Sequence, residues 1–394
     1  MKIPKLKLIT NKIAKLILSL VLIISLTACS TNRLNAQERI FLDLKLEFLD
    51  EYQLPKSNFN GTKVGGLSAI AYDPASTNYY VISDDRSNFA PARFYTFKIG
   101  FNQENLDNIT IEKVEVKNVT SLRNENGQTY PAGSIDFEGI AVSPKRTIFA
   151  SSEGIAKQKI APLIAEYDIE TGKQLSKLRL PDRYLPNETD TENEPPRGVQ
   201  DNLGFESLTL NPNGLATSDP FRLFTATEAA LLQDKIALNP ETSDRLRFLH
   251  YVIGPVGSPL LLAEHLYLLE PAPKNAIANG LTEITAIEPE GFFLTLERTF
   301  GAFGAGAKIF QVIIGNATDI SGVDSIKGEL GELQPLKKKL LLDLSELDIY
   351  LDNLEAMTLG PRFRDGTQSL ILLSDDNFRD SQVTQFLLFR LSEG

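Results

Sequence analysis

The chain has 394 residues, a formal net charge of −11, two histidines, one cysteine and no tryptophan. A single cysteine excludes a disulfide framework, and together with only two histidines it excludes a zinc site built from these residue types. Because an acidic surface repels phosphate backbones and attracts cations, we expect no nucleic-acid partner and expect cations to bind.

The first 28 residues have the features of a secretory signal peptide. Five lysines and no acid stand between Met1 and Lys15, and an apolar run follows from Leu16 to Leu26. That run is too short to span a bilayer core of about 30 Å. It ends in Leu26-Thr27-Ala28-Cys29. This segment resembles the bacterial lipobox, which implies that Cys29 is lipidated and becomes the first residue of the mature chain.

The resemblance to the lipobox predicts three segments. These are a signal peptide over 1–28, a lipidated tether over 29–38 and a single domain over 39–394. Ser30 follows the cysteine, so an aspartate that would signal retention at the inner membrane is absent from that position. We therefore expect an exported lipoprotein of the cell envelope, at the outer membrane or the periplasmic face, attached to the membrane through Cys29. The alternative is a signal peptide with an incidental cysteine.

A short apolar motif that begins a strand recurs five times, about every 70 residues. Its copies are marked by Ser68, Glu138, Glu206, Glu283 and Glu355. After a turn, each copy is followed by a second apolar strand that ends in an acid. These second acids are Asp84, Glu153, Glu228, Glu297 and Asp375. Self-similarity at a fixed period indicates a repeat architecture.

Each repeat continues with a third apolar strand and a more polar fourth strand. The last repeat stops after its third strand, and we expect the alternating segment 39–49 to supply the missing fourth one. Four antiparallel strands per unit, completed by a strand from the opposite terminus, are typical of a β-propeller. We therefore predict an all-β fold, a propeller of four-stranded antiparallel blades. Five blades are recognisable, and a sixth is left open.

The nine repeated acids form the candidate site. In a propeller the first strand of each blade lines the central channel, so acids that open the first strand and close the second fall at the same end. Carboxylates that converge in this way repel one another unless a positive charge lies among them. Oxygen ligands suit a hard cation, calcium above all, or magnesium. The alternative is a structural use, in which the acids cap backbone N–H groups or pair with arginines between blades.

Arginines recur near the same end of the repeats. Arg86 and Arg298 follow second-strand acids, and Arg379 lies in the corresponding loop of the last repeat. A planar guanidinium beside a bound cation makes a phosphate site. Salt bridges between blades are the alternative role. A serine-hydrolase route is not indicated, because no G-x-S-x-G motif is present and both histidines lie in strand-like segments.

A set of six segments carries a resemblance to a known family. They are Gly65-Gly66-Leu67-Ser68, Ser83-Asp84-Asp85-Arg86, Asp136-Phe137-Glu138-Gly139-Ile140, Gly204-Phe205-Glu206-Ser207-Leu208, Leu296-Glu297-Arg298 and Asn353-Leu354-Glu355-Ala356-Met357. The set resembles the phytase-like, "esterase-like activity of phytase" family over roughly Gly61 to Leu391. The resemblance implies a β-propeller and hydrolysis of phosphoric esters, by analogy with the calcium-dependent propeller phytases.

Two functional hypotheses follow. In the first, the chain is a monomeric, lipid-anchored phosphoesterase that acts on a small phosphate ester. Calcium would be held by the repeated carboxylates, Arg86 and Arg298 would steady the phosphate, and Glu206 would take a proton. In the second, the chain is a non-catalytic propeller of the cell envelope that binds a ligand or a protein and uses its acids structurally.

Overall fold

The repeated strands pair into five four-stranded antiparallel sheets. The computed structural model describes residues 40–187, 195–212, 219–236, 242–302 and 304–394. Within these ranges there is no α-helix, and the four short helices are of the 3-10 type. The predicted signal peptide, the tether and the lipidation at Cys29 lie outside the described residues.

The sheets follow one another along the chain. The first contains β4 (Leu67–Asp73), β5 (Asn78–Ser83), β6 (Arg93–Asn102) and β7 (Thr110–Ser121). The second contains β8 (Phe137–Val142), β9 (Thr147–Ser152), β10 (Leu163–Asp168) and β11 (Gln174–Lys177). The third contains β12 (Phe205–Pro212), β13 (Phe221–Thr227), β14 (Arg245–Ile253) and β15 (Leu260–Leu268).

The fourth sheet contains β16 (Ala276–Ile287), β17 (Phe292–Gly301), β18 (Gly304–Ile313) and β19 (Lys337–Asp343). The fifth contains β20 (Asn353–Arg362), β21 (Gln368–Asp375), β22 (Thr384–Glu393) and β1 (Leu44–Leu54). A separate hairpin pairs β2 (Ser57–Phe59) with β3 (Thr62–Val64). The 3-10 helices are η2 (Ala156–Gln158), η3 (Asp182–Tyr184), η4 (Leu232–Asp234) and η5 (Leu344–Leu347).

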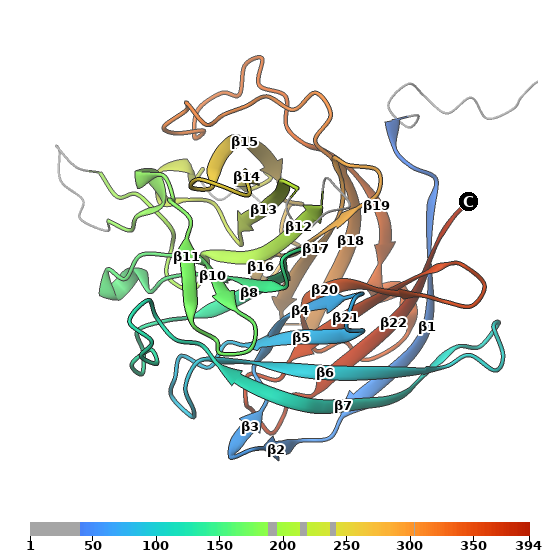
Figure 1. Cartoon of the computed structure of the whole chain (residues 1–394). Helices are drawn as coiled ribbons and strands as arrows, with labels where there is room; N and C mark the ends of the chain where they lie inside the picture. Colours follow the sequence, from blue (N-terminus) through green and yellow to red (C-terminus); the bar gives the residue numbers. More distant parts are fainter. Residues whose placement is uncertain (1–39, 188–194, 213–218, 237–241, 303) are drawn as a thin grey trace, which may run out of the picture. The chain divides into compact units, whose positions relative to one another are not determined.

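The five sheets are the blades of a β-propeller, as the repeats predicted (Figure 1). Their innermost strands β4, β8, β12, β16 and β20 contact one another in that cyclic order. No sixth four-stranded sheet is present among the described residues, where the remaining sheet is the β2–β3 hairpin. Residues Leu44–Gly394 form one compact unit.

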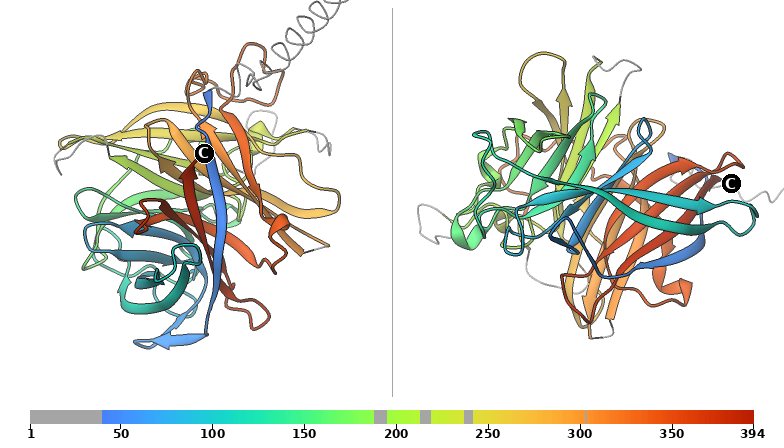
Figure 2. Two further views of the ribbon diagram at one scale, coloured as in Figure 1. Left: turned by 90° about the vertical axis from the view of Figure 1, so that its right-hand side faces the viewer. Right: turned by 60° about the horizontal axis from the view of Figure 1, so that its bottom comes forward.

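Strand β1 pairs with β22, from Leu44 opposite Glu393 to Leu54 opposite Thr384. Figure 2 shows the two strands side by side, β1 in blue and β22 in dark red. This is the pairing that the alternating segment 39–49 led us to expect, although the ladder lies further along the chain.

The core lies between neighbouring blades and is made of aromatic and branched side chains. Phe224 of β13 meets Phe293 of β17 with ring centroids 4.7 Å apart and planes at 71°, an edge-on geometry that favours aromatic pairs. His250 of β14 is buried and stacks on Phe224. His250 therefore serves the core, while His265 of the outer strand β15 is buried beside the carbonyl of Thr318. In the described part of the chain, no helix is long and apolar enough to cross a membrane.

Candidate functional site

The innermost strand of every blade carries a β-bulge, close to the start of the strand in four blades and in the middle of β16 in the fourth blade. The register with the second strand shifts there by one residue in all five sheets. A bulge leaves one residue out of the ladder and re-aims its side chain. The bulged residues are Ser68, Glu138, Glu206, Thr282 and Glu355.

In the fourth blade, the residues that we predicted as the repeated acids are displaced by one position from the equivalent residues of the other blades. Leu281 pairs with Glu297 as Phe205 pairs with Thr227 in the third blade. The residues that match Glu206 and Glu228 are therefore Thr282 and Arg298, one position from those we expected. Because side chains alternate along a strand, a shift of one residue turns them to the opposite face.

The two displaced acids are used elsewhere in the fold. The Glu283 carboxylate accepts hydrogen bonds from the amides of Ile284 at 2.9 Å and of Leu208 at 3.3 Å, and so ties β16 to β12. The Glu297 carboxylate accepts from the Tyr267 hydroxyl at 2.6 Å and pairs with Lys338 at 2.6 Å. The structure does not bring Glu283 and Glu297 to the other acids. Both have the structural role that the sequence left open as the alternative, since Glu283 binds backbone N–H groups and Glu297 pairs with a basic side chain.

The other seven predicted acids do come together. Glu138, Glu206 and Glu355 start the inner strands, and Asp84, Glu153, Glu228 and Asp375 end or follow the second strands. A cavity of about 740 Å³ is lined by five of them, all but Glu153 and Glu228. Its acidic lining includes Asp84, Asp136, Glu138, Glu206, Glu355 and Asp375.

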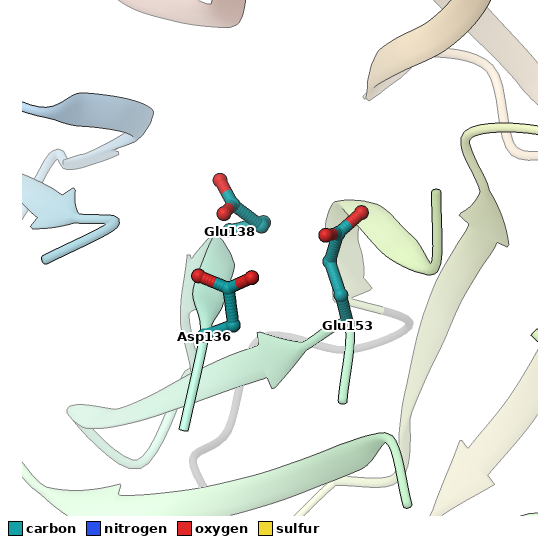
Figure 3. Close-up of side chains that lie close together, drawn as sticks. All are labelled: Asp136, Glu138 and Glu153. Atoms are coloured by element: carbon teal, nitrogen blue, oxygen red, sulfur yellow. The ribbon is translucent and has the colours of Figure 1, made fainter. Parts of the chain in front are cut away.

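Two carboxylate triads share one residue. Asp136, Glu138 and Glu153 offer ligand oxygens that lie within 4.8 Å of one another, and so do Glu153, Glu206 and Glu228. Figure 3 shows the first triad, with Asp136 and Glu138 at the start of β8 and Glu153 just after β9. Asp136 was quoted in the motif before Glu138 but was not among the predicted ligands. The sequence feature that could have identified Asp136 is its position two residues before Glu138, because residues two apart along a strand point to the same face.

A glycine two residues before the bulge, Gly204 in the third blade and Gly280 in the fourth, admits the acid of the preceding blade. The amide of Gly204 donates to Glu153 Oε1 at 2.8 Å, and a Cβ on this residue would lie 2.5 Å from the backbone oxygen of Glu153. A Cβ on Gly280 would lie 2.4 Å from Oε1 of Glu228. Only glycine leaves room for these approaches, so the placement of Glu153 and Glu228 depends on these two glycines.

The electrostatics of the cluster favour a bound proton or cation. Burial raises the pKa of Asp84 to about 7, and the charges of Glu355, Asp136 and Asp85 add to that effect. Burial, and then the charge of Glu153, hold the pKa of the Glu206 carboxyl well above its usual range. The pKa values of Glu138, Glu153 and Asp375 are raised for the same reasons. Each of these carboxylates loses hydration and faces like charge, and both effects disfavour ionisation.

Arg298 supplies positive charge within the ring. Its Nη2 donates to Glu228 Oε1 at 2.9 Å, and its Nη1 donates to Glu355 and to Asn353. Arg298 therefore forms salt bridges with an acid of the third blade and an acid of the fifth blade. This is the interblade role that the sequence left open as the alternative to phosphate binding. Its Nε has no hydrogen-bond partner among the described residues.

Arg86 lies at the rim of the same cavity. Its Nη2 contacts Asp136 Oδ2 and Asn202 Oδ1, each at 2.5 Å. About a third of its side chain is exposed, 34%, in contrast to the largely buried Arg298. Arg379, the third predicted arginine, also lines the cavity. All three arginines are thus brought to the acids, and Arg86 and Arg379 face the open part of the site.

The donor set fits a hard divalent cation. All candidate ligands are carboxylate oxygens, which calcium and magnesium prefer. Two buried oxygens, Glu153 Oε2 and Asp84 Oδ1, have no hydrogen-bond partner among the described residues. A buried, unpaired carboxylate oxygen is costly unless a cation or a proton compensates it. The shared residue Glu153 is therefore the most direct indication of a cation site.

A family model described as "Phytase-like: Esterase-like activity of phytase" matches residues 62–378. No curated protein matches the sequence. Among solved structures, the chain is similar to an endo-arabinase from Bacteroides thetaiotaomicron, with 12% identity and a TM-score of 0.40 over 88% of this chain and 98% of that chain.

Two further structures are similar over comparable lengths. One is an α-L-arabinofuranosidase from Podospora anserina, with 10% identity and a TM-score of 0.39 over 88% of this chain and 97% of that chain. The other is the WD40 domain of Pan2 from Neurospora crassa, with 8% identity and a TM-score of 0.33 over 88% of this chain and 95% of that chain.

Proposed function

The chain belongs to the phytase-like (esterase-like activity of phytase) family, and from this premise we propose that it hydrolyses phosphoric esters with the help of a divalent cation held in the central cavity. The observation that carries the proposal is the pair of carboxylate triads that share Glu153, whose Oε2 is buried and without a hydrogen-bond partner in the described structure. Its triad partners Asp136, Glu138 and Glu206 line an open cavity that also presents arginines.

The residues suited to hold the cation are Asp136, Glu138, Glu153, Glu206 and Glu228. We propose calcium before magnesium, because calcium accepts more oxygen ligands in less regular arrangements. Bound there, a divalent cation supplies charge that polarises a phosphoryl oxygen and lowers the pKa of a water molecule.

The chain's own residues would orient the ester and move the proton. Arg86 is partly exposed at the cavity rim, and its Nη1 and Nε make no hydrogen bond among the described residues, so the guanidinium can contact a phosphate. Arg298 is committed to Glu228 and Glu355 and offers only its remaining N–H groups. We therefore assign phosphate binding first to Arg86 and a positioning role to Arg298.

Glu206 is the candidate general base. It lines the cavity, and burial together with neighbouring charge raises the pKa of its carboxyl well above the usual range. A carboxylate with a raised pKa accepts a proton near neutral pH more readily than an ordinary glutamate. In the proposed reaction Glu206 accepts a proton from the water that attacks phosphorus, and Arg86 holds the phosphate in place. The P–O bond to the alcohol breaks, and the leaving oxygen takes up the proton that Glu206 accepted.

We also propose that the chain acts in the cell envelope as an exported lipoprotein anchored through Cys29. The basis is the sequence Leu26-Thr27-Ala28-Cys29 and the apolar run before it. Metabolic labelling with a radioactive fatty acid tests this proposal. Wild-type chain should take up label and a Cys29→Ala variant should not.

Turnover of 4-nitrophenyl phosphate by the full-length chain, purified in detergent, tests the catalytic proposal. We expect hydrolysis that requires calcium, stops with a chelator and falls at least a hundredfold in Glu206→Gln, as is usual when a general base is lost. Glu332→Gln is the matched control, because Glu332 is exposed and lies outside the cavity. Calcium binding without turnover of any phosphate ester would support the non-catalytic envelope propeller instead.

A further inference from the structure

An aromatic rim borders the acidic cavity. Four aromatic side chains are part of its lining, namely Phe89, Phe300, Tyr350 and Phe378. Three of them are strongly exposed, Phe89 at 67%, Tyr350 at 63% and Phe300 at 49%. Large aromatic side chains are costly to leave in water, and exposed apolar surface beside a cavity marks a place where a ligand packs.

Phe89 and Phe378 form one half of this rim. Their ring centroids lie 4.9 Å apart with planes at 44°. Phe89 follows β5 in the first blade, and Phe378 follows β21 in the fifth. Two loops from neighbouring blades therefore build a single apolar surface beside the carboxylates.

Both loops are held by the second member of an Asp-Asp pair. Asp84 and Asp375 face the carboxylate cluster, while the residue after each one binds loop amides. Asp85 Oδ1 accepts from the amides of Asn88 at 2.8 Å and Phe89 at 3.0 Å. Its Oδ2 pairs at 2.6 Å with Arg93, which is completely buried.

Asp376 plays the same part for Phe378. Its Oδ1 accepts from the amides of Phe378 at 3.0 Å and Gly66 at 2.9 Å, and Lys63 Nζ donates to the carbonyl of Phe378 at 3.0 Å. The φ angle of Phe378 is +53°, a left-handed conformation that is unfavourable for a bulky residue. These bonds hold the ring at the rim against that cost.

The charges of the cavity limit what can bind beside the rim. Among the described residues, eight carboxyl groups and three arginines line it, and no lysine does. Arg298 is already paired with two glutamates. A substrate with many phosphate groups would meet this surplus of negative charge, whereas one phosphate group needs only Arg86 and a bound cation.

The rim also discriminates between a neutral ring and an organic cation. Lys63 Nζ lies 5.5 Å from the centroid of Phe378 and 6.0 Å from that of Phe89. Its ammonium group occupies the cation–π position of this pair. A second cation at the same place would be repelled, so a neutral aromatic ring is the better partner for Phe89 and Phe378.

We propose that the substrate is a phosphate monoester with a single phosphate group, whose alcohol part carries an aromatic ring that packs on Phe89 and Phe378. This proposal rests on the phosphoesterase function proposed above and names its substrate class. The ester oxygen and phosphate lie over the carboxylates and Arg86, and the ring lies against the rim.

The test compares 2-phenylethyl phosphate with propyl phosphate, because both release an alkyl alcohol of similar acidity. We expect the full-length, calcium-loaded chain to prefer the phenylethyl ester about tenfold in kcat/KM, the scale of one aromatic contact. Phe89→Ala should bring the ratio close to one, and Phe89→Tyr should preserve it. Val256→Ala is the control, because Val256 is 89% exposed and does not line the cavity.

A binding measurement separates this proposal from the catalytic one. Calorimetry compares 3-phenylpropylphosphonate with butylphosphonate, which cannot be hydrolysed at the same position. Tighter binding of the phenyl compound that is lost in Phe89→Ala, with no turnover of any ester, would keep the aromatic subsite and overturn the hydrolase. Turnover without a phenyl preference would keep the hydrolase and overturn the subsite.

Three other outcomes also count against the subsite. A preference for inositol hexakisphosphate would contradict the charge argument, and a preference for phosphocholine would show that the rim selects an organic cation. An equal loss of kcat/KM for both alkyl esters in Phe89→Ala would assign Phe89 to folding or to phosphate binding rather than to ring recognition.

Discussion

Arg298 donates from Nη2 to Glu228 Oε1 over 2.9 Å and occupies, on β17, the position where the other four blades carry Asp84, Glu153, Glu228 and Asp375. The ring of second-strand residues is therefore four acids and one arginine. The arginine neutralises part of the charge of the third and fifth blades. Of the triad residues, Glu138, Glu153 and Glu206 are then left without a salt bridge in the described structure.

Removing the Arg298 guanidinium should destabilise the fold strongly. Arg298→Ala leaves Glu228 and Glu355 buried without their counter-charge, and breaking a buried pair in this way costs about 3–5 kcal/mol. Urea unfolding followed by fluorescence or circular dichroism measures the loss. Arg364→Ala is the control, since Arg364 is exposed and its side chain makes no ion pair in the described structure. Equal stability of the two variants would contradict the buried role of Arg298.

The stability of the metal-free protein should fall as pH rises from about 4 to about 7. Asp84 has a folded-state pKa of about 7, above the value of about 3.9 expected for an unfolded chain. The folded state then holds more protons in this window, so the free energy of unfolding decreases with increasing pH. Asp84→Asn should make the dependence less steep in chelator-treated protein, while the other buried acids of the cluster with raised pKa values keep the rest of it. A stability that rises over the same window would show that Asp84 is ionised in the fold.

Calcium should stabilise the protein through the triads and not through Glu283. At a free concentration about 100 times the dissociation constant, a ligand of the native state adds about 2.7 kcal/mol. Glu153→Gln should remove most of this gain, because Glu153 belongs to both triads. Glu283→Gln should lower the basal stability, since its carboxylate binds two amides, and should keep the calcium gain.

The calcium experiment is read by differential scanning calorimetry with and without calcium. A shift in melting temperature that persists in Glu153→Gln would place the cation elsewhere. A shift lost in Glu283→Gln would show that Glu283 is a cation ligand, as the sequence alone had indicated for the fourth blade.

Replacing Gly204 by alanine should perturb the shared glutamate. The added Cβ would lie 2.5 Å from the backbone oxygen of Glu153 and 2.7 Å from its Cα, so the backbone must move. We expect a loss of about 1–3 kcal/mol, as for other overpacked sites, and weaker calcium binding. Gly322→Ala is the control, because a Cβ there meets no atom within 4 Å. Unchanged stability and calcium affinity in Gly204→Ala would show that β12 can shift without disturbing Glu153.

The sequence alone was sufficient for the architecture. Strand alternation and a period of about 70 residues are local properties, and each repeat must bury an apolar face against its neighbours. The same reasoning located seven acids that meet, from Asp84 in the first blade to Asp375 in the fifth. An acid that opens one strand and an acid that closes its antiparallel neighbour lie at the same end in any such blade.

The tertiary structure decided what depends on a single residue of register and on contacts between blades. The sequence pattern of β16 does not decide whether Thr282 or Glu283 is the bulged residue. The pairing of Leu281 with Glu297 shows that it is Thr282. A bulge inserts one residue into a strand and so reverses the side-chain phase beyond it. Contacts between residues far apart in the chain, such as Arg298 with Glu228 and Phe89 with Phe378, arise only once the ring of blades is assembled.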